Sequence, residues 1–166
     1  MRRPTWCWPR SRSRTARRSA SPASHSTERG RLIDSIEVRT RGRGLHEITE
    51  AVQAAVRRSG IREGLCTVLV QHTSASLIIQ ENADPSARRD LEAWMERHVP
   101  EDDPHFTHTA EGPDDMPSHI RAALTATSLS MPIADGRLAL GTWQGVWLWE
   151  HRTRGSTRRC VIHIGA

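Results

Sequence analysis

The sequence predicts one compact α+β domain, with a mainly antiparallel β-sheet and helices packed against it. Three observations lead to this fold class. β-prone segments alternate with a few helical ones, Asp135-Gly136 is a turn signal that joins two such segments as a hairpin, and the parallel βαβ pattern of nucleotide-binding folds is missing. Residues 30–166 have the length of one ordinary domain and enough apolar residues for a core.

The first half of this domain contains two kinds of periodicity. Residues 32–39 alternate apolar and polar side chains, which predicts a strand that faces solvent on one side. Residues 48–56 carry apolar side chains at helical spacing, and Gly60 is a C-terminal stop signal. Residues 65–72 form a strongly β-prone run, and residues 76–80 continue as a second short strand.

The second half begins with a helix that Asp84-Pro85 starts and Pro100 ends. Residues 101–113 have the composition of a loop, and a loop of this length suggests a function. A short helix is expected at 116–125. Four strand-like segments complete the domain, at residues 128–133, 137–142, 146–151 and 158–164.

The basic charge of the chain is confined to its N-terminal tail. Residues 1–30 carry eight arginines and one acid, a net charge of +7, whereas the rest of the chain has a net charge of −2. A mildly acidic body argues against a nucleic-acid partner. Residues 1–29 are rich in Arg, Ser, Thr and Pro without apolar periodicity, so we expect them to be disordered.

The apolar runs and the cysteines of the chain indicate in which cellular compartment the protein is located. The chain contains no apolar stretch of signal-peptide or transmembrane length, so we expect no membrane association. Cys66 and Cys160 lie in apolar strand-like runs, where a thiol usually behaves as a small buried hydrophobe. Nothing indicates a disulfide framework, and we predict a reducing, cytoplasmic location.

The most informative segment runs from Glu111 to His119, with the sequence EGPDDMPSH. Asp114 and Asp115 can cap a helix that starts at about residue 116, because a carboxylate accepts the unpaired N–H groups of the first turn. His119 then falls in that turn, where the helix dipole disfavours imidazolium and keeps a nitrogen free to bind a metal or accept a proton. The alternative is an acidic cap beside a surface histidine.

A second cluster of polar residues is Gln71-His72-Thr73-Ser74-Ala75-Ser76. His72 ends an apolar row on the preceding strand, so we expect it to face inward. An inward imidazole needs a partner, which is either a backbone carbonyl or a metal. Asn82 and nearby acids follow closely and could supply oxygen ligands or hydrogen bonds to phosphate.

The third cluster spans residues 141–152, GTWQGVWLWEHR. Its two glycines suggest a tight bend that approaches a ligand or another chain. Alternation then places Glu150 at the end of an apolar row, where it must meet an arginine, a metal-bound histidine or a substrate proton. The tryptophans either pack in a core or interface, or form a stacking surface for an aromatic ligand.

Together the segments QHTSAS, EGPDDMPSH and GTWQGVWLWEHR closely resemble the YjbQ-like family, whose members are described as secondary thiamine-phosphate synthases. The resemblance runs from about Leu32 to the C-terminus and implies a homotrimer with a histidine-containing pocket at or near subunit contacts. Trp149 departs from the family pattern, which has a small residue there, and the tail has no counterpart. The positions that match the family's histidines and polar residues are His72, His108, His119, Glu111, Asp114, Asp115, Glu150 and His151.

The resemblance implies an enzyme that joins a pyrimidine diphosphate to a thiazole phosphate. Zn²⁺ or another divalent transition metal would bind His72, His108 and His119 and keep an open position, and Mg²⁺ could accompany the diphosphate. The predicted catalytic residues are Glu111, Asp115, His119 and Glu150. The predicted substrate-binding residues are Thr73, Ser74, Asn82, Trp143, Gln144, His151 and Arg152.

Two other functions remain open from the sequence. One is a metal-dependent hydrolase or lyase that acts on another small phosphorylated or heterocyclic metabolite. The other is a noncatalytic trimeric protein that binds a metal or ligand. The common kinds of glycine-rich phosphate cradle are missing from the sequence, which suggests that the synthase activity is secondary to another one.

Overall fold

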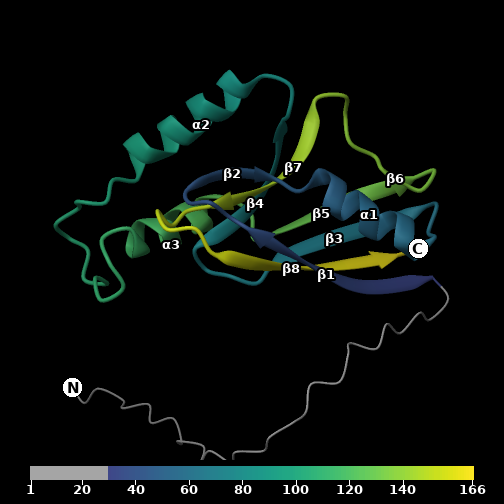
Figure 1. Ribbon diagram of the computed structural model, residues 1–166, viewed down its shortest axis with the longest axis horizontal. Coiled ribbons are helices and arrows are strands. Elements are labelled where there is room, and N and C mark those ends of the chain that lie inside the picture. Colours follow the sequence, from purple (N-terminus) through teal and green to yellow (C-terminus); the bar gives the residue numbers. More distant parts are fainter. Residues whose placement is uncertain (1–29) are drawn as a thin grey trace, which may run out of the picture.

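The computed structural model describes residues 30–166, and the disorder predicted for residues 1–29 lies outside the described residues. Three helices and eight strands follow one another in this part of the chain (Figure 1). Their order is β1 (Arg31–Arg39), β2 (Gly44–Glu47), α1 (Thr49–Ser59), β3 (Gly64–Val70), β4 (Ala75–Glu81), α2 (Pro85–His98), α3 (Asp115–Leu124), β5 (Ser128–Ala134), β6 (Arg137–Leu138), β7 (Gln144–Glu150) and β8 (Thr157–Gly165).

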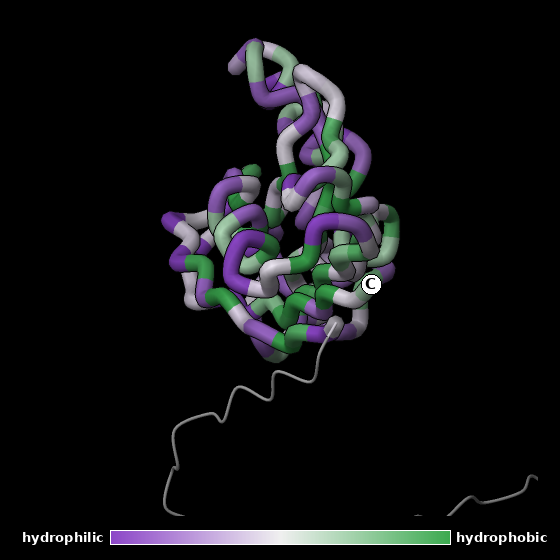
Figure 2. The backbone as a smooth tube through the Cα atoms, turned by 90° about the vertical axis from the view of Figure 1, so that its right-hand side faces the viewer, coloured by the Kyte–Doolittle hydropathy of each residue, from purple (hydrophilic) through white to green (hydrophobic). Residues whose placement is uncertain are grey.

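Two antiparallel sheets confirm the predicted α+β class. The larger sheet has the strand order β1-β8-β3-β5-β6, and the smaller one has the order β2-β7-β4. Every strand pairing is antiparallel. In Figure 1, α3 lies at one end of the sheets, and α2 lies above them together with the loop that precedes β7. Figure 2 shows a rounded body from which a narrower arm projects.

The main core lies between the two sheets and α1. Apolar side chains from β3, β4, β7 and β8 meet there, and Val52 and Val56 of α1 are completely buried against them. A second, smaller cluster packs α2 against β2 and β7. Burial of these apolar surfaces drives the assembly of the domain.

Strand β7 contributes to both clusters. Val146 and Leu148 belong to the main core, whereas Trp147 and Trp149 belong to the cluster under α2. The predicted alternation of side chains along this strand is therefore confirmed. Trp147 and Trp149 pack in a core, which was one of the two interpretations of the tryptophans. The indole of Trp143, one residue before the strand, is exposed.

Local turn and cap signals correspond closely to the structure. Asp135 and Gly136 both have positive φ angles, of 53° and 75°, as a two-residue hairpin turn between β5 and β6 requires. Gly60 ends α1 in the left-handed conformation, and its N–H donates to the carbonyl of Arg57. The Asp84 carboxylate caps α2 by accepting the N–H of Ser86.

Two strands differ from the sequence predictions. The strand predicted at residues 137–142 pairs only at Arg137–Leu138, because the chain turns away after the hairpin. Strand β2 is absent from the sequence predictions, yet residues 44–47 pair with the C-terminal half of β7. Cys66 and Cys160 are buried free thiols as predicted, and burial raises the pKa of each to about 11. Within residues 30–166, every helix is too short or too polar to cross a bilayer.

Candidate functional site

Three metal-ligating side chains converge at the start of α3. His108 comes from the loop before the helix, Asp115 is the first helical residue, and His119 follows one turn later. One ligand atom from each lies within 4.8 Å of the others. The Nε2 atoms of His108 and His119 lie 2.8 and 3.5 Å from Oδ2 of Asp115. We call these three residues the His-Asp-His cluster.

The cluster combines a buried carboxylate with two accessible imidazoles. Asp115 is 2% exposed, whereas the side chains of His108 and His119 are 50% and 31% exposed. Asp115 and His119 are four residues apart, so they project from the same face of the helix. A ligand can therefore approach the cluster from the side of the histidines while the carboxylate stays fixed in the protein.

The two oxygens of Asp115 have different surroundings. Oδ1 accepts a hydrogen bond from Nη1 of Arg152. Oδ2 is buried and accepts no hydrogen bond in the described structure, although both imidazole nitrogens face it. A buried carboxylate oxygen is costly unless a positive group faces it, and a protonated imidazole or a metal ion would meet that need at this point.

A hydrogen bond fixes the tautomer of His119. Its Nδ1 atom lies 3.1 Å from the backbone oxygen of Thr73, which can only accept a hydrogen bond. Nδ1 therefore carries the proton, and in the neutral ring Nε2 presents a lone pair toward Asp115. Backbone carbonyls orient metal-binding histidines in the same way.

Arg152 is held entirely by groups around the cluster. Besides Asp115, its guanidinium donates to Oδ2 of Asp114 at 3.2 Å and to the backbone oxygen of Glu111 at 2.7 Å. The Glu111 carboxylate is exposed and lies 3.8 Å from the same guanidinium. Three of the five guanidinium N–H groups of Arg152 thus bind acidic and carbonyl oxygens, and its predicted contact with substrate stays a prediction.

Asp114 serves the loop after β7 and does not cap the helix. Its side chain makes no capping hydrogen bond to α3, which corrects the sequence prediction. Instead Oδ2 accepts the N–H and the hydroxyl of Thr153, both at 2.9 Å. Burial alone would raise the pKa of Asp114, but the Thr153 hydrogen bonds and the Arg152 charge lower it below its ordinary value.

Glu150 is a structural residue. It is fully buried, and Arg158 donates two hydrogen bonds to it at 2.7 and 2.6 Å. The Thr40 hydroxyl and the Arg152 N–H donate to the same carboxylate. Burial opposes ionisation, but these donors hold the pKa of Glu150 below its ordinary value. Pairing with an arginine was one of the three sequence-based alternatives, and the predicted catalytic role is not supported because no substrate can reach the carboxylate.

His151 is also inaccessible to substrate. It is fully buried, and its Nε2 lies 2.8 Å from the Ser76 hydroxyl. Burial, with the charge of Arg121, lowers the pKa of His151 to about 3, so the ring is neutral. The predicted substrate contact is thus replaced by a packing role. Ser74 is buried next to it, and its backbone oxygen accepts the N–H of His151.

His72 differs from its predicted orientation. It is exposed, because β3 ends at Val70 and the chain turns outward before the histidine. Its Nδ1 accepts the N–H of Ser74 at 3.0 Å. Of the three histidines in the predicted ligand set, His108 and His119 come together, and Asp115 lies with them where His72 was expected.

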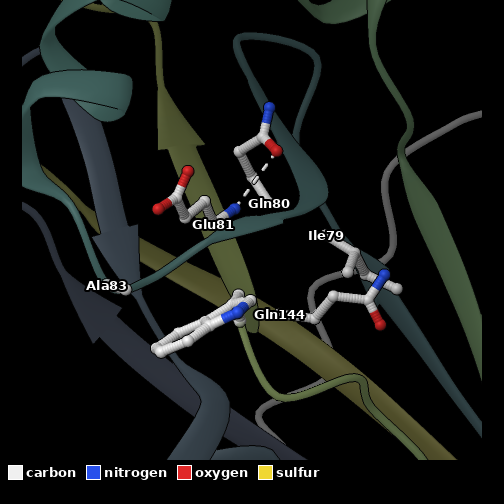
Figure 3. Close-up of a pocket in the computed structure, with 6 residues that line it drawn as sticks. Ile79, Gln80, Glu81, Ala83 and Gln144 are labelled. Carbon is white, nitrogen blue, oxygen red and sulfur yellow. Dashed lines mark hydrogen bonds between the residues drawn. The ribbon is translucent and has the colours of Figure 1, made fainter.

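The remaining predicted substrate residues lie at the other end of the smaller sheet. Asn82 donates its N–H to the backbone of Trp143, and Trp143 and Gln144 line a cavity of about 460 Å³. Figure 3 shows this cavity with side chains from the end of β4 and the start of β7. In the β4–β7 ladder Glu81 pairs with Gln144, whereas Ala75 pairs with Glu150, so the structure separates the predicted site into two places.

A different cavity adjoins the His-Asp-His cluster. It has a volume of about 360 Å³ and is bordered by His108 and Met116. The loop 101–113, which its length marked as functional, supplies most of the wall, including Glu101, Asp102 and Asp103. The space beside the cluster is therefore large enough for a small metabolite and has an acidic wall.

Sequence reasoning assigned Asp115 a catalytic role but did not place it with His108 and His119 in the transition-metal ligand set. The four-residue spacing of Asp115 and His119 was the available signal, since it places both on one helix face. The Thr73 carbonyl that orients His119 had no such signal, because any residue offers a backbone oxygen.

Comparisons with known proteins agree in one family. The family model described as "UPF0047 protein YjbQ-like" matches residues 34–166. The UPF0047 protein sll1880 of Synechocystis sp. is 55% identical over 127 residues, which are 76% of this chain and 86% of the relative. The UPF0047 protein YjbQ of Escherichia coli O157:H7 is 43% identical over 131 residues, 78% of this chain and 94% of the relative.

Solved structures show the same fold. An uncharacterized conserved protein of the yjbq/upf0047 family from Clostridium acetobutylicum has a TM-score of 0.73 and 32% identity, and covers 79% of this chain and 98% of its own. The conserved hypothetical protein TT1486 from Thermus thermophilus has a TM-score of 0.71, with the same identity and the same coverage of both chains.

Proposed function

The chain belongs to the YjbQ-like UPF0047 family, and from this membership and its site we propose that it is a metal-dependent enzyme acting on a small phosphorylated or heterocyclic metabolite. His108, Asp115 and His119 would hold a divalent transition metal. The specific reaction to test first is the thiamine-phosphate synthase reaction, which joins a pyrimidine diphosphate to a thiazole phosphate and releases pyrophosphate.

The observation that carries the proposal is Oδ2 of Asp115. This oxygen is buried and accepts no hydrogen bond, while two imidazole nitrogens face it at 2.8 and 3.5 Å. The lone pair of His119 and the negative oxygen repel each other unless a proton or a metal cation lies between them. Two imidazoles and one carboxylate form a set that suits Zn²⁺, Fe²⁺ or Ni²⁺.

The residues around the cluster have clear supporting tasks. The Thr73 carbonyl orients His119, and Arg152 holds Asp115 through its other oxygen. A metal in such a site with open positions acts as a Lewis acid and lowers the pKa of bound water. His108 faces the adjoining cavity, so a substrate placed there would meet the cluster on its accessible side.

The charge around the cavity narrows the way a phosphate could bind. Its wall contains three acids from the loop 101–113, and three N–H groups of the Arg152 guanidinium already bind protein oxygens. The charge of a phosphate or diphosphate would therefore have to be offset by metal ions, the transition metal or added Mg²⁺. A metal-dependent hydrolase or lyase is therefore a second candidate. Such a reaction can proceed on a group bound to the metal and does not need an arginine to hold a diphosphate.

The decisive experiment combines metal analysis with turnover. Wild-type protein, His119→Ala and the control His105→Ala would be loaded with Zn²⁺, Fe²⁺, Ni²⁺ or Co²⁺ and analysed for bound metal. Each would then be incubated with the pyrimidine diphosphate, the thiazole phosphate and Mg²⁺. His105 is an exposed histidine of the same loop outside the cluster, so its loss should change neither readout.

Each outcome separates the candidates. Stoichiometric metal and multiple turnovers, both lost in His119→Ala alone, would support the synthase. Bound metal without thiamine phosphate would redirect the search to hydrolysis or elimination of other phosphorylated substrates. Bound metal with no turnover of any of them would favour a noncatalytic binding protein, and a protein that binds no divalent metal in all four trials would refute the proposal.

A homotrimer in a reducing, cytoplasmic setting completes the proposal. A second copy as partner is supported by the family resemblance and by Ile33, Leu65 and Leu69, which are exposed on the outer face of the larger sheet. The free thiols of Cys66 and Cys160 support a reducing compartment. Light scattering after size exclusion would give the mass, and a monomer at micromolar concentration would refute the trimer.

A further inference from the structure

His72 lies beside the His-Asp-His cluster but outside it. The backbone oxygen of the next residue, Thr73, lies 3.1 Å from Nδ1 of His119 and orients that ring. The charges of Arg158, His119 and Arg152 all act on the neighbouring imidazole of His72. This imidazole is exposed, so a ligand that approaches the cluster from the side of His119 can also reach it.

A backbone hydrogen bond fixes the tautomer of His72. The N–H of Ser74 donates to Nδ1 of the ring, with 3.0 Å between the two nitrogens. A nitrogen that accepts a hydrogen bond uses its lone pair, so in the neutral ring the proton is on Nε2. The ring of His119 has the opposite arrangement, with the proton on Nδ1 and the lone pair on Nε2. The two histidines are therefore suited to different tasks.

This tautomer separates His72 from the metal ligands. An imidazole binds a metal through an unprotonated nitrogen. Ligation through Nε2 of His72 would move the proton to Nδ1, where it would face the N–H of Ser74. Within residues 30–166 the Nε2–H group donates to no protein acceptor, so it is available to a ligand.

The surroundings of His72 keep its ring neutral. Partial burial and the charge of Arg158 lower the pKa of His72, the charge of Glu150 opposes them, and the charges of His119 and Arg152 lower it further. A neutral imidazole can polarise a substrate oxygen by donating a hydrogen bond while it keeps its proton. Most of the charges that act on the ring are positive, which favours an anionic group beside it over a cationic one.

The two sides of the His-Asp-His cluster therefore differ in charge. On the side of His108, three acids of the loop 101–113 line the cavity and repel an anion. On the side of His119, the Thr73 carbonyl leads directly to the Nε2–H donor of His72. An anionic group of a ligand bound at the cluster is favoured on this second side.

We propose that His72 binds a phosphoryl oxygen of the substrate by donating a hydrogen bond from Nε2, while the His-Asp-His cluster holds the metal. This role rests on the proposed function, because the metal would place the phosphoryl group beside the ring. The phosphoryl group would lie on the side of His119, and the organic part of the substrate would extend toward the cavity beside His108. His72 then contacts substrate and is not the metal ligand that the sequence predicted.

Histidine variants separate a substrate donor from a metal ligand. Wild type, His72→Ala, His72→Gln and the control His163→Ala would be loaded with Zn²⁺, analysed for bound metal and titrated with inorganic phosphate. His163 is an exposed histidine on the outer face of the larger sheet, so its loss should change neither readout.

We expect the four proteins to bind the same amount of metal. Phosphate affinity should fall about 10-fold or more in His72→Ala, because a charged acceptor loses its donor. The amide of His72→Gln can place an N–H group near the position of Nε2 and should restore part of this affinity.

Nitrogen NMR of the labelled wild-type protein reads the ring directly. The chemical shifts of Nδ1 and Nε2 distinguish the two tautomers, in metal-free and in Zn²⁺-loaded protein. We expect the proton on Nε2 in both forms, and a shift of the Nε2 signal when phosphate is added.

Four results would overturn the role of His72. They are a proton on Nδ1, loss of metal from His72→Ala, equal phosphate affinity in His72→Ala and wild type, and no phosphate binding to wild type. Failure of the proposed function would look different, as a wild-type protein that binds no metal. The tautomer of His72 and the response of Nε2 to phosphate in metal-free protein would then still decide whether His72 is a phosphate donor.

Discussion

Replacing Arg158 by methionine should show what the buried Glu150 carboxylate needs from its partner. Arg158 is 4% exposed and donates two of the four hydrogen bonds that Glu150 accepts. Its loss leaves a fully buried anion with only the Thr40 hydroxyl and one backbone N–H. Breaking a buried ion pair from one side typically costs about 3–5 kcal/mol. We expect a loss of that size in the free energy of unfolding.

Urea denaturation of four proteins would measure the effect. Wild type, Arg158→Met, Glu150→Gln and the double variant form a mutant cycle, and we expect the double variant to lose less stability than the two single losses added together. Unchanged m-values would show that stability alone is altered. A loss below about 1 kcal/mol in Arg158→Met would refute the structural assignment. Normal stability of Glu150→Gln with abolished turnover would restore the catalytic role predicted from the sequence.

Three other predictions test the surroundings of the cluster. Arg152→Met should weaken divalent-metal affinity by roughly 10–100-fold, because it releases Asp115, and a Co²⁺ titration that matches wild type would contradict this. The pKa of Asp114 is lowered in the folded protein, so its contribution to stability is present above the ordinary value near 3.8 and is lost as the pH falls through the lowered pKa. Urea midpoints between pH 6 and pH 2 should show this loss in wild type, and a similar acid dependence in Asp114→Asn would count against it. Cys66 and Cys160, with pKa values of about 11, should resist iodoacetamide at pH 8 until the protein is unfolded, and rapid labelling of the native protein at either position would show that the burial is wrong.

The features that the sequence predicted best are those that depend on residues adjacent in the chain. Asp135-Gly136 and Asp84-Pro85 determine a hairpin turn and a helix start through local backbone preferences, and both are found in the structure. Strand β2 escaped prediction because its stability comes from pairing with β7, about one hundred residues later, and not from its own four residues.

The candidate site shows the same limit. EGPDDMPSH supplied Asp115 and His119, but the partners of Glu150 and Arg152 depend on strand register and loop packing that no local pattern reveals. One separation was foreseeable. Trp143 and His151 flank β7 and are separated by eight steps along the chain, so at about 3.3 Å per residue they lie roughly 26 Å apart, too far to share one small ligand.

Both faces of β7 are buried, and this fixes the spacing between the cavity beside Trp143 and the cavity beside the His-Asp-His cluster. A slip of one residue would exchange the faces of the strand and push Trp147 and Trp149 into the space that Val146 and Leu148 fill. Because the large indoles do not fit there, the register of β7 is fixed, and the length of the strand sets the distance between its two ends. One of its ends marks the cavity beside Trp143 and the other ends at Glu150, next to Arg152. Evolution could therefore reshape either cavity through its loops while the distance between them stayed constant.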